Sequence, residues 1–178
     1  MLTAGHGTAT AEALTALLTG AGVTIVADVR RFPASRRHPQ FDREAMTAWL
    51  AEAGIAYRWE PRLGGRRPVP PDSPDVALRN DAFRGYAAHM RSAAFSSALD
   101  EVLALDGVAV LCAESLWWRC HRRLIADAAV LLRGVEVRHL GHDGRLTAHA
   151  PTEGVRIEGG GLVYDVGVTG RLSGPDQG

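Results

Sequence analysis

The sequence predicts an α/β fold, a three-layer sandwich with a mainly parallel sheet and helices on both faces. Two observations lead to this fold class. Short apolar runs alternate with amphipathic stretches of helical length, which is the pattern of repeated βαβ units. The apolar runs at residues 23–30 and 107–114 are nearly continuous, as expected of strands buried on both faces of a parallel sheet. We expect a single α/β domain over residues 1–150.

The first half of the chain begins with a strand, a helix and a second strand. Leu14, Leu17 and Leu18 have helical spacing in the first predicted helix. Asp42 is expected to cap the second helix, and Gly54 to end it. Prolines and charges predict a loop before that helix. In order, these elements are a strand at residues 1–7, a helix at 10–22, a strand at 23–30, a loop at 31–41, a helix at 42–54 and a strand at 55–61.

The second half contains the most hydrophobic strand and the longest predicted helix, which runs from about Leu116 to Leu132. Residues 151–178 are a glycine-rich C-terminal extension. For the last part of the chain we expect a small strand pair, from residues 144–149 and 161–167, or partial disorder toward the end. The other elements are an irregular segment at 62–75, two helices within 83–105, a strand at 107–114 and a strand at 135–141.

Composition narrows the class of protein. A hydrophobic fraction of 46% with 22% charged residues is ordinary for a soluble globular protein. No apolar run approaches the length of a membrane span, and the N-terminus lacks the basic and apolar regions of a secretory signal. Two cysteines do not make a disulfide framework. We therefore expect a cytoplasmic protein with no membrane partner. The sequence specifies neither a cofactor nor an oligomeric state.

The charged residues are informative by type. The net charge is zero, which argues against a protein that coats nucleic acid without specificity. All 20 basic residues are arginine, which is also the expected result of mutational bias in a genome of high G+C content. Because the guanidinium group binds phosphate and carboxylate with a planar pair of donors, the places where arginines cluster matter more than their number.

Polar residues follow several of the predicted strands. Ligands of open parallel sheets bind beyond the carboxyl ends of the strands, so these residues form the candidate site. His6 stands out because its flanking glycines allow backbone to approach a ligand closely. The residues at the four strand ends are Gly5, His6 and Gly7; Asp28, Arg30 and Arg31; Arg62, Gly64, Gly65 and Arg66; and Cys112, Glu114 and Ser115.

The segment "VLCAESLWWRCHRRLIAD" favours an anion site. Ser115 is expected to cap the following helix, whose unpaired N–H groups and dipole attract an anion. Arg122 lies in the first turns of that helix. Glu114 and Asp28 each follow a buried strand, where a carboxylate needs an arginine partner. We expect Asp28 either to pair with Arg30 or Arg122 or to have a catalytic role, and we expect Asp28, Glu114 and Arg122 to lie close together. The alternative is that these groups form a structural ion-pair network or a solvated helix face.

The same segment raises thiol and metal alternatives. Six residues separate Cys112 from Arg119, one more than cysteine-dependent phosphatases use, although a covalent Cys112 nucleophile stays open. The cysteines lack the short Cys-x-x-Cys spacing of zinc knuckles. Helical spacing would also place Cys120 with Leu124 and Ala128 on an apolar face, which favours a core position. We therefore predict no metal site and no structural disulfide.

Five motifs occur here in the order of a known prokaryotic family: "TAGHG", "VADVRRFPASRRHPQF", "PRLGGRR", "YAAHM" with "FSSALDEVLAL", and "VLCAESLWWRCHRRLIAD". The chain resembles the family labelled domain of unknown function 488 over residues 2–150. The family usually begins with Gly-His-Ser, and this chain has Gly7 in place of the serine. The resemblance implies a compact cytoplasmic α/β domain and no established reaction. Its signature residues map onto His6, Asp28, Arg30, Ser35, Gly64, Gly65, Cys112, Glu114, Cys120, His121 and Arg122.

Three hypotheses follow. The leading one is an enzyme or enzyme-like domain that binds a small anionic ligand, such as a nucleotide or a nucleic-acid end. A rival is a noncatalytic nucleic-acid-binding module that uses the arginines of loop 30–41, with Phe32 or Phe41 stacking on bases. A third is a thiol-based redox or metal protein that uses Cys112 and Cys120. For the leading hypothesis, the catalytic candidates are His6, Asp28, Glu114, His121 and Cys112, and the anion-binding candidates are Arg30, Ser35, Gly64, Gly65, Arg66, Ser115 and Arg122.

Overall fold

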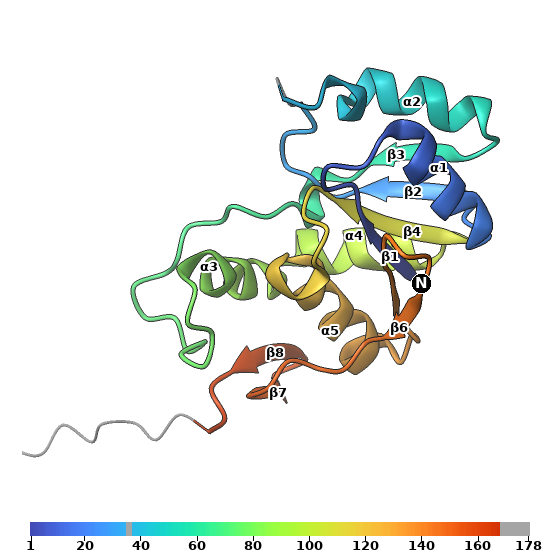
Figure 1. The fold of residues 1–178 in the computed structure, drawn as a ribbon. Helices are drawn as coiled ribbons and strands as arrows, with labels where there is room; N and C mark the ends of the chain where they lie inside the picture. Colours follow the sequence, from blue (N-terminus) through green and yellow to red (C-terminus); the bar gives the residue numbers. More distant parts are fainter. Residues whose placement is uncertain (35–36, 168–178) are drawn as a thin grey trace, which may run out of the picture.

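A mostly parallel sheet organises the protein (Figure 1). The computed structural model describes residues 1–34 and 37–167. Within them the sheet has the order β3-β2-β4-β1-β5-β6, in which β6 is antiparallel to its neighbour. This topology confirms the predicted fold class. The strands of the sheet are β1 (Leu2–Gly5), β2 (Ile25–Asp28), β3 (Ala56–Trp59), β4 (Val108–Cys112), β5 (Arg138–Leu140) and β6 (Leu146–Ala148).

Strand β4 is the most thoroughly buried strand, as its apolar sequence predicts, and each of its residues is buried. Val110 and Cys112 face one hydrophobic core, whereas Ala109 and Leu111 face the other. Alternate side chains of a strand point to opposite faces, so a strand with a core on each side must be apolar throughout. The sheet is therefore covered on both faces.

Two helices cover one face and three cover the other (Figure 1). Leu18 and Leu50 of the first group pack in one core, and Tyr86, Leu99 and Leu124 of the second group pack in the other. Side-chain caps begin several of these helices where the sequence offers Ser, Thr or Asn. The first group is α1 (Ala11–Gly20) and α2 (Arg43–Glu52), and the second is α3 (Asp81–Met90), α4 (Ala93–Leu103) and α5 (Arg122–Arg133).

Helix α5 begins later than predicted. The structure has a short 3₁₀ turn, η3 (Trp117–Arg119), then extended backbone at Cys120, and α5 starts only at Arg122. The indole ring of Trp117 stacks on the His139 ring at 3.9 Å between centroids, which holds this turn against β5. A tertiary contact has thus overridden the helical spacing. The prediction that Ser115 caps this helix is wrong, because His121 occupies the cap position of α5.

The C-terminal strands exist, but their predicted pairing is wrong. Residues 144–149 contain β6, which pairs with β5, and residues 161–167 contain β8 (Gly161–Tyr164), which pairs with β7 (Val155–Glu158). Gly159 and Gly160 both have positive φ, of 56° and 79°, as a two-residue hairpin turn requires. Tyr164 anchors this hairpin, because its hydroxyl donates to the buried Asp127 at 3.0 Å. The predicted tail disorder lies outside the described residues.

None of the helices in the described part of the chain is long and apolar enough to cross a bilayer.

Candidate functional site

The predicted convergence of strand ends is confirmed at the carboxyl edge of the sheet. A side chain at Gly5 would overlap the carbonyl oxygen of Glu114, and one at Gly7 would overlap the Ser115 hydroxyl. The loops that follow β1 and β4 are therefore in close contact. Asp28 is in register with Leu111 of the neighbouring β4, so Asp28 and Glu114 lie at the same edge, as expected.

Asp28 forms a buried ion pair at the end of β2. Its carboxylate accepts hydrogen bonds from Arg30 Nε at 2.9 Å and Arg30 Nη2 at 2.6 Å, and from the Tyr57 hydroxyl at 2.7 Å. Burial acts to lower the pKa of Arg30, but the hydrogen bonds to Asp28 outweigh it and raise this pKa. Burial and the Asp28 carboxylate raise the pKa of Tyr57. Of the two ion-pair partners predicted for Asp28, Arg30 is the one that contacts it.

His6 completes this group, which we name the Asp28 cluster (His6, Asp28, Arg30 and Tyr57). His6 Nδ1 lies 3.0 Å from the Gly7 carbonyl oxygen, and His6 Nε2 lies 3.4 Å from Arg30 Nη1. Burial lowers the pKa of His6 to about 4, and the Arg30 charge acts in the same direction. His6 is therefore neutral near pH 7, with Nδ1–H donating to Gly7 and Nε2 accepting from Arg30.

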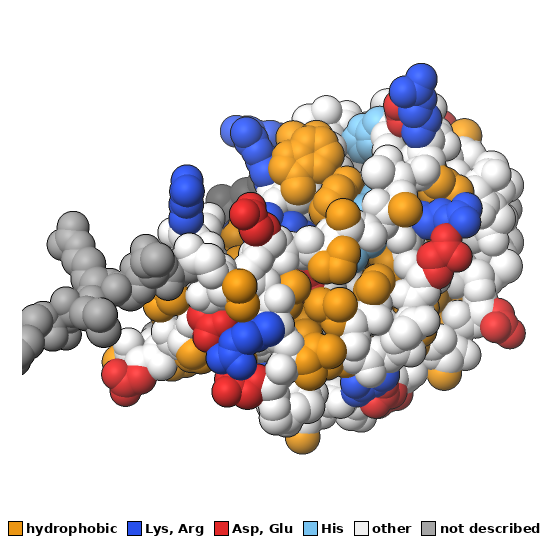
Figure 2. Space-filling view, turned by 90° about the horizontal axis from the view of Figure 1, so that it is seen from below, with side chains coloured by type: hydrophobic (Ala, Val, Ile, Leu, Met, Phe, Trp, Pro, Cys, Tyr) orange, Lys and Arg blue, Asp and Glu red, His pale blue; other side chains and the backbone are white. Residues whose placement is uncertain are grey.

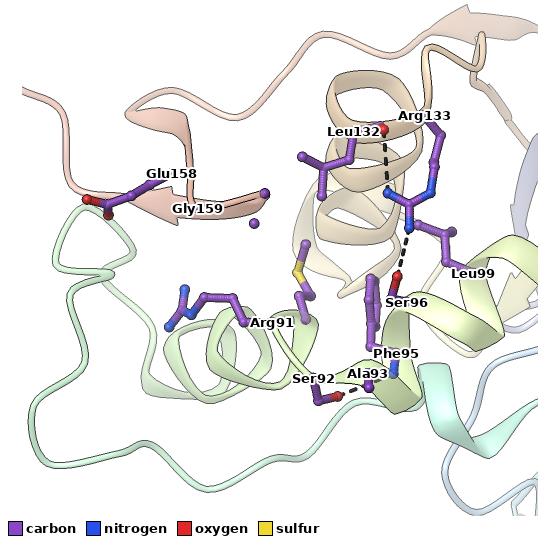
Figure 3. A pocket seen from close by; sticks show the side chains of 13 residues that line it. Arg91, Ser92, Ala93, Phe95, Ser96, Leu99, Leu132, Arg133, Glu158 and Gly159 are labelled. Atoms are coloured by element: carbon purple, nitrogen blue, oxygen red, sulfur yellow. Dashed lines mark hydrogen bonds between the residues drawn. The ribbon is translucent and has the colours of Figure 1, made fainter.

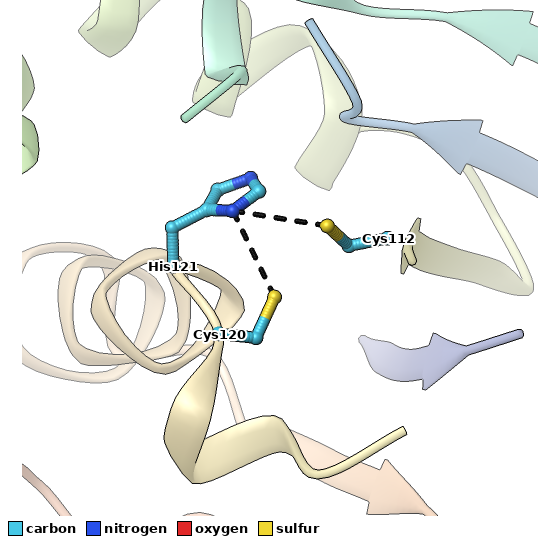
Figure 4. A group of neighbouring side chains, drawn as sticks. All are labelled: Cys112, Cys120 and His121. Carbon is cyan, nitrogen blue, oxygen red and sulfur yellow. Dashed lines mark hydrogen bonds between the residues drawn. The ribbon is translucent and has the colours of Figure 1, made fainter. Parts of the chain in front are cut away.

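A second group lies at the end of β4, and we name it the cysteine cluster (Cys112, Cys120, His121 and Arg122); Figure 4 draws the first three of these residues. His121 Nδ1 lies 3.8 Å from Cys112 Sγ and 3.7 Å from Cys120 Sγ. Arg122 Nε donates to Cys120 Sγ at 3.3 Å, and Cys112 Sγ donates to Glu114 Oε2 at 3.1 Å. Both cysteines are free, which confirms the prediction of no structural disulfide.

The pKa values of the two cysteines are shifted in opposite directions. The neighbouring Cys120 sulfur, burial and the Glu114 carboxylate together raise the pKa of Cys112 well above its usual value. Burial also acts to raise the pKa of Cys120, but the contacts with Cys112, His121 and Arg122 outweigh it and hold this pKa well below its usual value. Cys120 is therefore the more acidic thiol of the pair, and Cys112 is the less acidic one. Thiolate chemistry, assigned to Cys112 from the sequence, fits Cys120 better.

His121 is enclosed yet incompletely bonded. Its Nε2 atom is buried and has no hydrogen-bond partner among the described residues. The His121 ring meets Tyr86 edge to face at 5.0 Å between centroids. A Cβ atom at Gly65 would lie 3.1 Å from His121 Nδ1, so the loop after β3 packs directly on the imidazole. This packing places Gly65, one of the predicted strand-end residues, at the candidate site.

The predicted anion-binding arginines differ in availability. Arg30 is committed to Asp28, and Arg122 donates to the Glu114 carbonyl oxygen and to Cys120. Arg66, by contrast, is exposed, and its carbonyl oxygen accepts from Arg31 Nη1 at 2.7 Å. Within residues 1–34 and 37–167, neither Arg31 nor Arg66 has a carboxylate within ion-pair distance. Ser35, also predicted to bind the anion, lies outside the described residues.

One further residue of the edge, Tyr57, was not singled out from the sequence, because its role comes from a tertiary contact with Asp28 and no local sequence signal marks it. The sequence did single out Phe32 and Phe41, as residues that stack on nucleic-acid bases. Phe41 is buried and stacks on the His6 ring at 4.1 Å, so the proposal that it stacks on a nucleic-acid base is wrong. Phe32, the other aromatic residue of that loop, is 65% exposed.

Two pockets lie elsewhere on the molecule. One, of about 370 Å³, is lined by residues of the α3–α4 junction, α5 and the β7–β8 turn, including Arg91, Phe95 and Arg133 (Figure 3). The other, of about 460 Å³, lies at the opposite, amino edge of the sheet and is lined by residues such as Leu2 and Val108. Neither pocket includes a residue of the Asp28 cluster or of the cysteine cluster.

Fold and site together define an α/β protein whose parallel strands gather ionisable residues and thiols at their carboxyl edge. The chain matches the family model described as "Domain of unknown function DUF488" over residues 10–129, and it belongs to this family. This finding confirms the resemblance seen in the motifs. Comparison with curated proteins and comparison with solved structures each found no match.

Proposed function

We propose that the protein is a cytoplasmic enzyme, or an enzyme-like domain, that binds a small phosphate-bearing anion at the carboxyl edge of the sheet. One observation carries the proposal: two exposed arginines without carboxylate partners in the described chain, Arg31 and Arg66, are joined by a hydrogen bond at the Gly64–Gly65 loop, which packs on the His121 ring. Guanidinium groups bind phosphate strongly, and free cysteines are typical of a reducing compartment.

The anion is held by the exposed arginines in this proposal. Arg31 and Arg66 are joined by a hydrogen bond, and Gly64 and Gly65 bring the Arg31 backbone and the His121 ring to the same loop. Arg30 and Arg122 have a structural role in this proposal, because Nε and Nη2 of each already donate hydrogen bonds within the protein.

Proton transfer would involve the end of β4. The Glu114 side chain is exposed and accepts a hydrogen bond from the Cys112 thiol, which offers a path for a proton between the buried sulfurs and a ligand at the surface. His121 faces both sulfurs from the other side. His6 and Asp28 act as positioning residues, because each is buried and bonded to Arg30.

The test is calorimetric titration with inorganic phosphate, mononucleotides and short oligonucleotides. Arg31→Ala and Arg66→Asn should each weaken binding by roughly tenfold or more, as expected for a lost charged hydrogen bond. Asparagine is chosen because Arg66 has a φ of 58°, which asparagine tolerates. Arg145→Ala is the control, since its side chain is 87% exposed and, unlike Arg31 and Arg66, lies within ion-pair distance of a carboxylate, that of Asp143. Equal affinity in all variants, or no binding by any probe, would overturn the proposal.

Salt dependence separates this proposal from a noncatalytic nucleic-acid-binding module. A surface that follows many phosphates loses affinity steeply as salt rises, whereas a small-anion site is less sensitive. On the face drawn in Figure 2, arginines lie beside acidic side chains and do not form a continuous basic surface. Steep salt dependence with oligonucleotides alone would favour the module instead.

The positions of the two sulfurs support a second candidate, a thiol-based redox protein. Cys112 Sγ and Cys120 Sγ lie within 4.8 Å of each other, close enough for a disulfide after a small rearrangement. Forming it would remove two protons and pass two electrons to an oxidant such as another disulfide or a peroxide. Thiol titration after equilibration in glutathione buffers tests this candidate, which predicts a reversible change from two thiols to none.

A further inference from the structure

We propose that Cys112, Cys120 and His121 form a binding site for a divalent zinc-class cation, with a fourth coordination position left open. The two sulfur atoms and His121 Nδ1 all lie within 4.8 Å of one another (Figure 4). Thiolate and imidazole are the preferred ligands of Zn²⁺, and three protein ligands with an open position are typical of catalytic zinc sites. This inference goes beyond the anion site and does not depend on it.

The spacing of the three atoms fits a tetrahedral ion. Bonds of about 2.3 Å to sulfur and about 2.0–2.1 Å to nitrogen, at tetrahedral angles, place a sulfur and a nitrogen about 3.6 Å apart. The observed distances from His121 Nδ1 are 3.8 Å to Cys112 Sγ and 3.7 Å to Cys120 Sγ. The two nitrogen–sulfur distances therefore need to shorten by only a few tenths of an ångström to bind the ion, and the two sulfur atoms lie within 4.8 Å of each other.

The backbone explains how these residues meet. Cys112 is the last residue of β4, whereas Cys120 is extended and His121 caps α5. The argument that Cys120 lies on the core face of a helix fails, because the helix begins only after it. Gly65 leaves room above His121 Nδ1, where any side chain would approach the atom to 3.1 Å.

The surroundings suit two metal-bound thiolates. A divalent cation with two thiolates carries no net charge, and Arg122 Nε donates to Cys120 Sγ as an outer-shell partner. The exposed Glu114 carboxylate, 3.1 Å from Cys112 Sγ, provides a polar route from solvent to the site.

One feature limits the expected affinity. A metal-bound histidine usually donates its second N–H to an acceptor, and losing that partner costs about 10–100-fold in affinity. His121 Nε2 has no such acceptor among the described residues. We therefore expect weaker binding than in a closed structural zinc site with four protein ligands.

The experiment is a titration of the reduced, metal-free, full-length protein with Co²⁺, followed by displacement with Zn²⁺. Binding should saturate at one equivalent and give the visible d–d bands of tetrahedral cobalt with a thiolate-to-cobalt charge-transfer band. Binding should weaken by roughly 100-fold or more in each of Cys112→Ser, Cys120→Ser and His121→Asn. This loss exceeds the one expected when a residue is changed that contacts a metal ligand but not the metal. His142→Asn should bind as the parent does, since this exposed imidazole bonds the Gly5 carbonyl at the same edge.

Folding is checked separately, by circular dichroism of every variant without metal. The proposal is overturned if the parent shows no thiolate–cobalt band, or if folded cysteine and His121 variants bind Co²⁺ as tightly as the parent. Spontaneous disulfide formation that competes with one equivalent of Zn²⁺ would also overturn it, in favour of the redox candidate.

Discussion

The Asp28 cluster and the cysteine cluster lie at the ends of neighbouring strands, yet they differ in how their bonding capacity is used. In the Asp28 cluster, the carboxylate, the guanidinium and both nitrogens of His6 have partners. In the cysteine cluster, His121 Nε2 has no partner within the described chain, and two sulfurs face one nitrogen.

This difference indicates different roles. A buried charge is costly unless it is paired and hydrogen-bonded, so a fully bonded ion pair is suited to holding a scaffold. A buried polar atom without a partner lowers stability, and in native proteins each such atom needs an explanation, such as a catalytic role or an unseen ion. We infer that the Asp28 cluster fixes the edge of the sheet and that the cysteine cluster supplies its chemistry.

The largest effect should come from breaking the Asp28 ion pair. Asp28→Asn leaves Arg30 buried with an uncompensated charge, since the exposed fractions of the two side chains are 0% and 7%. We expect a loss of about 3–5 kcal/mol in the free energy of unfolding, measured by urea denaturation.

The exposed ion pair of Asp143 and Arg145 provides the control for this variant. Asp143→Asn should leave the unfolding midpoint unchanged, because that pair is solvated and 3.6 Å apart. The double variant Asp28→Leu/Arg30→Met should lose less stability than Asp28→Asn alone, since it removes both charges. Near-parental stability of Asp28→Asn would contradict the scaffold role.

The second effect is a pH dependence that originates in His6. Its pKa is about 4 in the folded protein and 6.5 when unperturbed, so protonation favours the unfolded state. The contribution of neutral His6 to the free energy of unfolding is fully present above about pH 6.5. It falls as the pH is lowered toward 4, by up to about 3 kcal/mol. His139, whose pKa burial lowers to about 3, acts in the same direction.

Unfolding measured from pH 7 to pH 4 tests this dependence. His6→Gln removes one titrating group and should flatten the fall in stability while leaving the contribution of His139. The slope is compared, so a change in absolute stability does not affect the result. An unchanged slope would show that His6 is protonated as readily in the folded protein as in the unfolded chain.

A smaller effect is expected for Tyr57→Phe. This variant removes one hydrogen bond to the Asp28 carboxylate, which keeps its bonds to Arg30. We expect a loss of about 1.5 kcal/mol, at the lower end for a hydrogen bond to a charged group. In a double-mutant cycle with Asp28→Asn the effect should shrink, because the charged acceptor is gone. If Tyr57→Phe lowers the free energy of unfolding of the Asp28→Asn variant by the same amount as that of the parent, the contribution of Tyr57 comes from packing and not from this hydrogen bond.

The sequence predicted the fold well because the fold depends on local patterns. Strand and helix periodicities located the elements of the sheet and its layers. The predicted start of α5 was wrong because the helical spacing of Cys120, Leu124 and Ala128 continues the pattern too far toward the N-terminus, whereas Trp117 is held by the distant His139. The pairing of the C-terminal strands depends likewise on contacts far apart in the sequence.

The candidate site was predictable in position but not in internal bonding. Strand-end residues are recognisable because parallel strands bring them to one edge. Whether Asp28 pairs with Arg30 or Arg122, and whether His121 has a partner, depends on orientations that no local pattern encodes. Tyr57 was missed for the same reason.

The smallest change in stability should come from the cysteine cluster. His121→Phe removes a buried nitrogen that has no partner among the described residues and keeps a ring that can pack edge to face against Tyr86. The lost contacts with the two sulfurs are long, at 3.7 and 3.8 Å, so gain and loss should nearly cancel. In the reduced, metal-free protein the free energy of unfolding should stay within about 1 kcal/mol of the parent. His89→Phe is the matched control: it faces the same tyrosine, but its Nε2 bonds the Arg62 carbonyl oxygen at 2.7 Å, so this variant should lose about 1 kcal/mol or more. If His121→Phe is instead as destabilising as Asp28→Asn, the cysteine cluster is a structural element, and the contrast between the two strand ends fails.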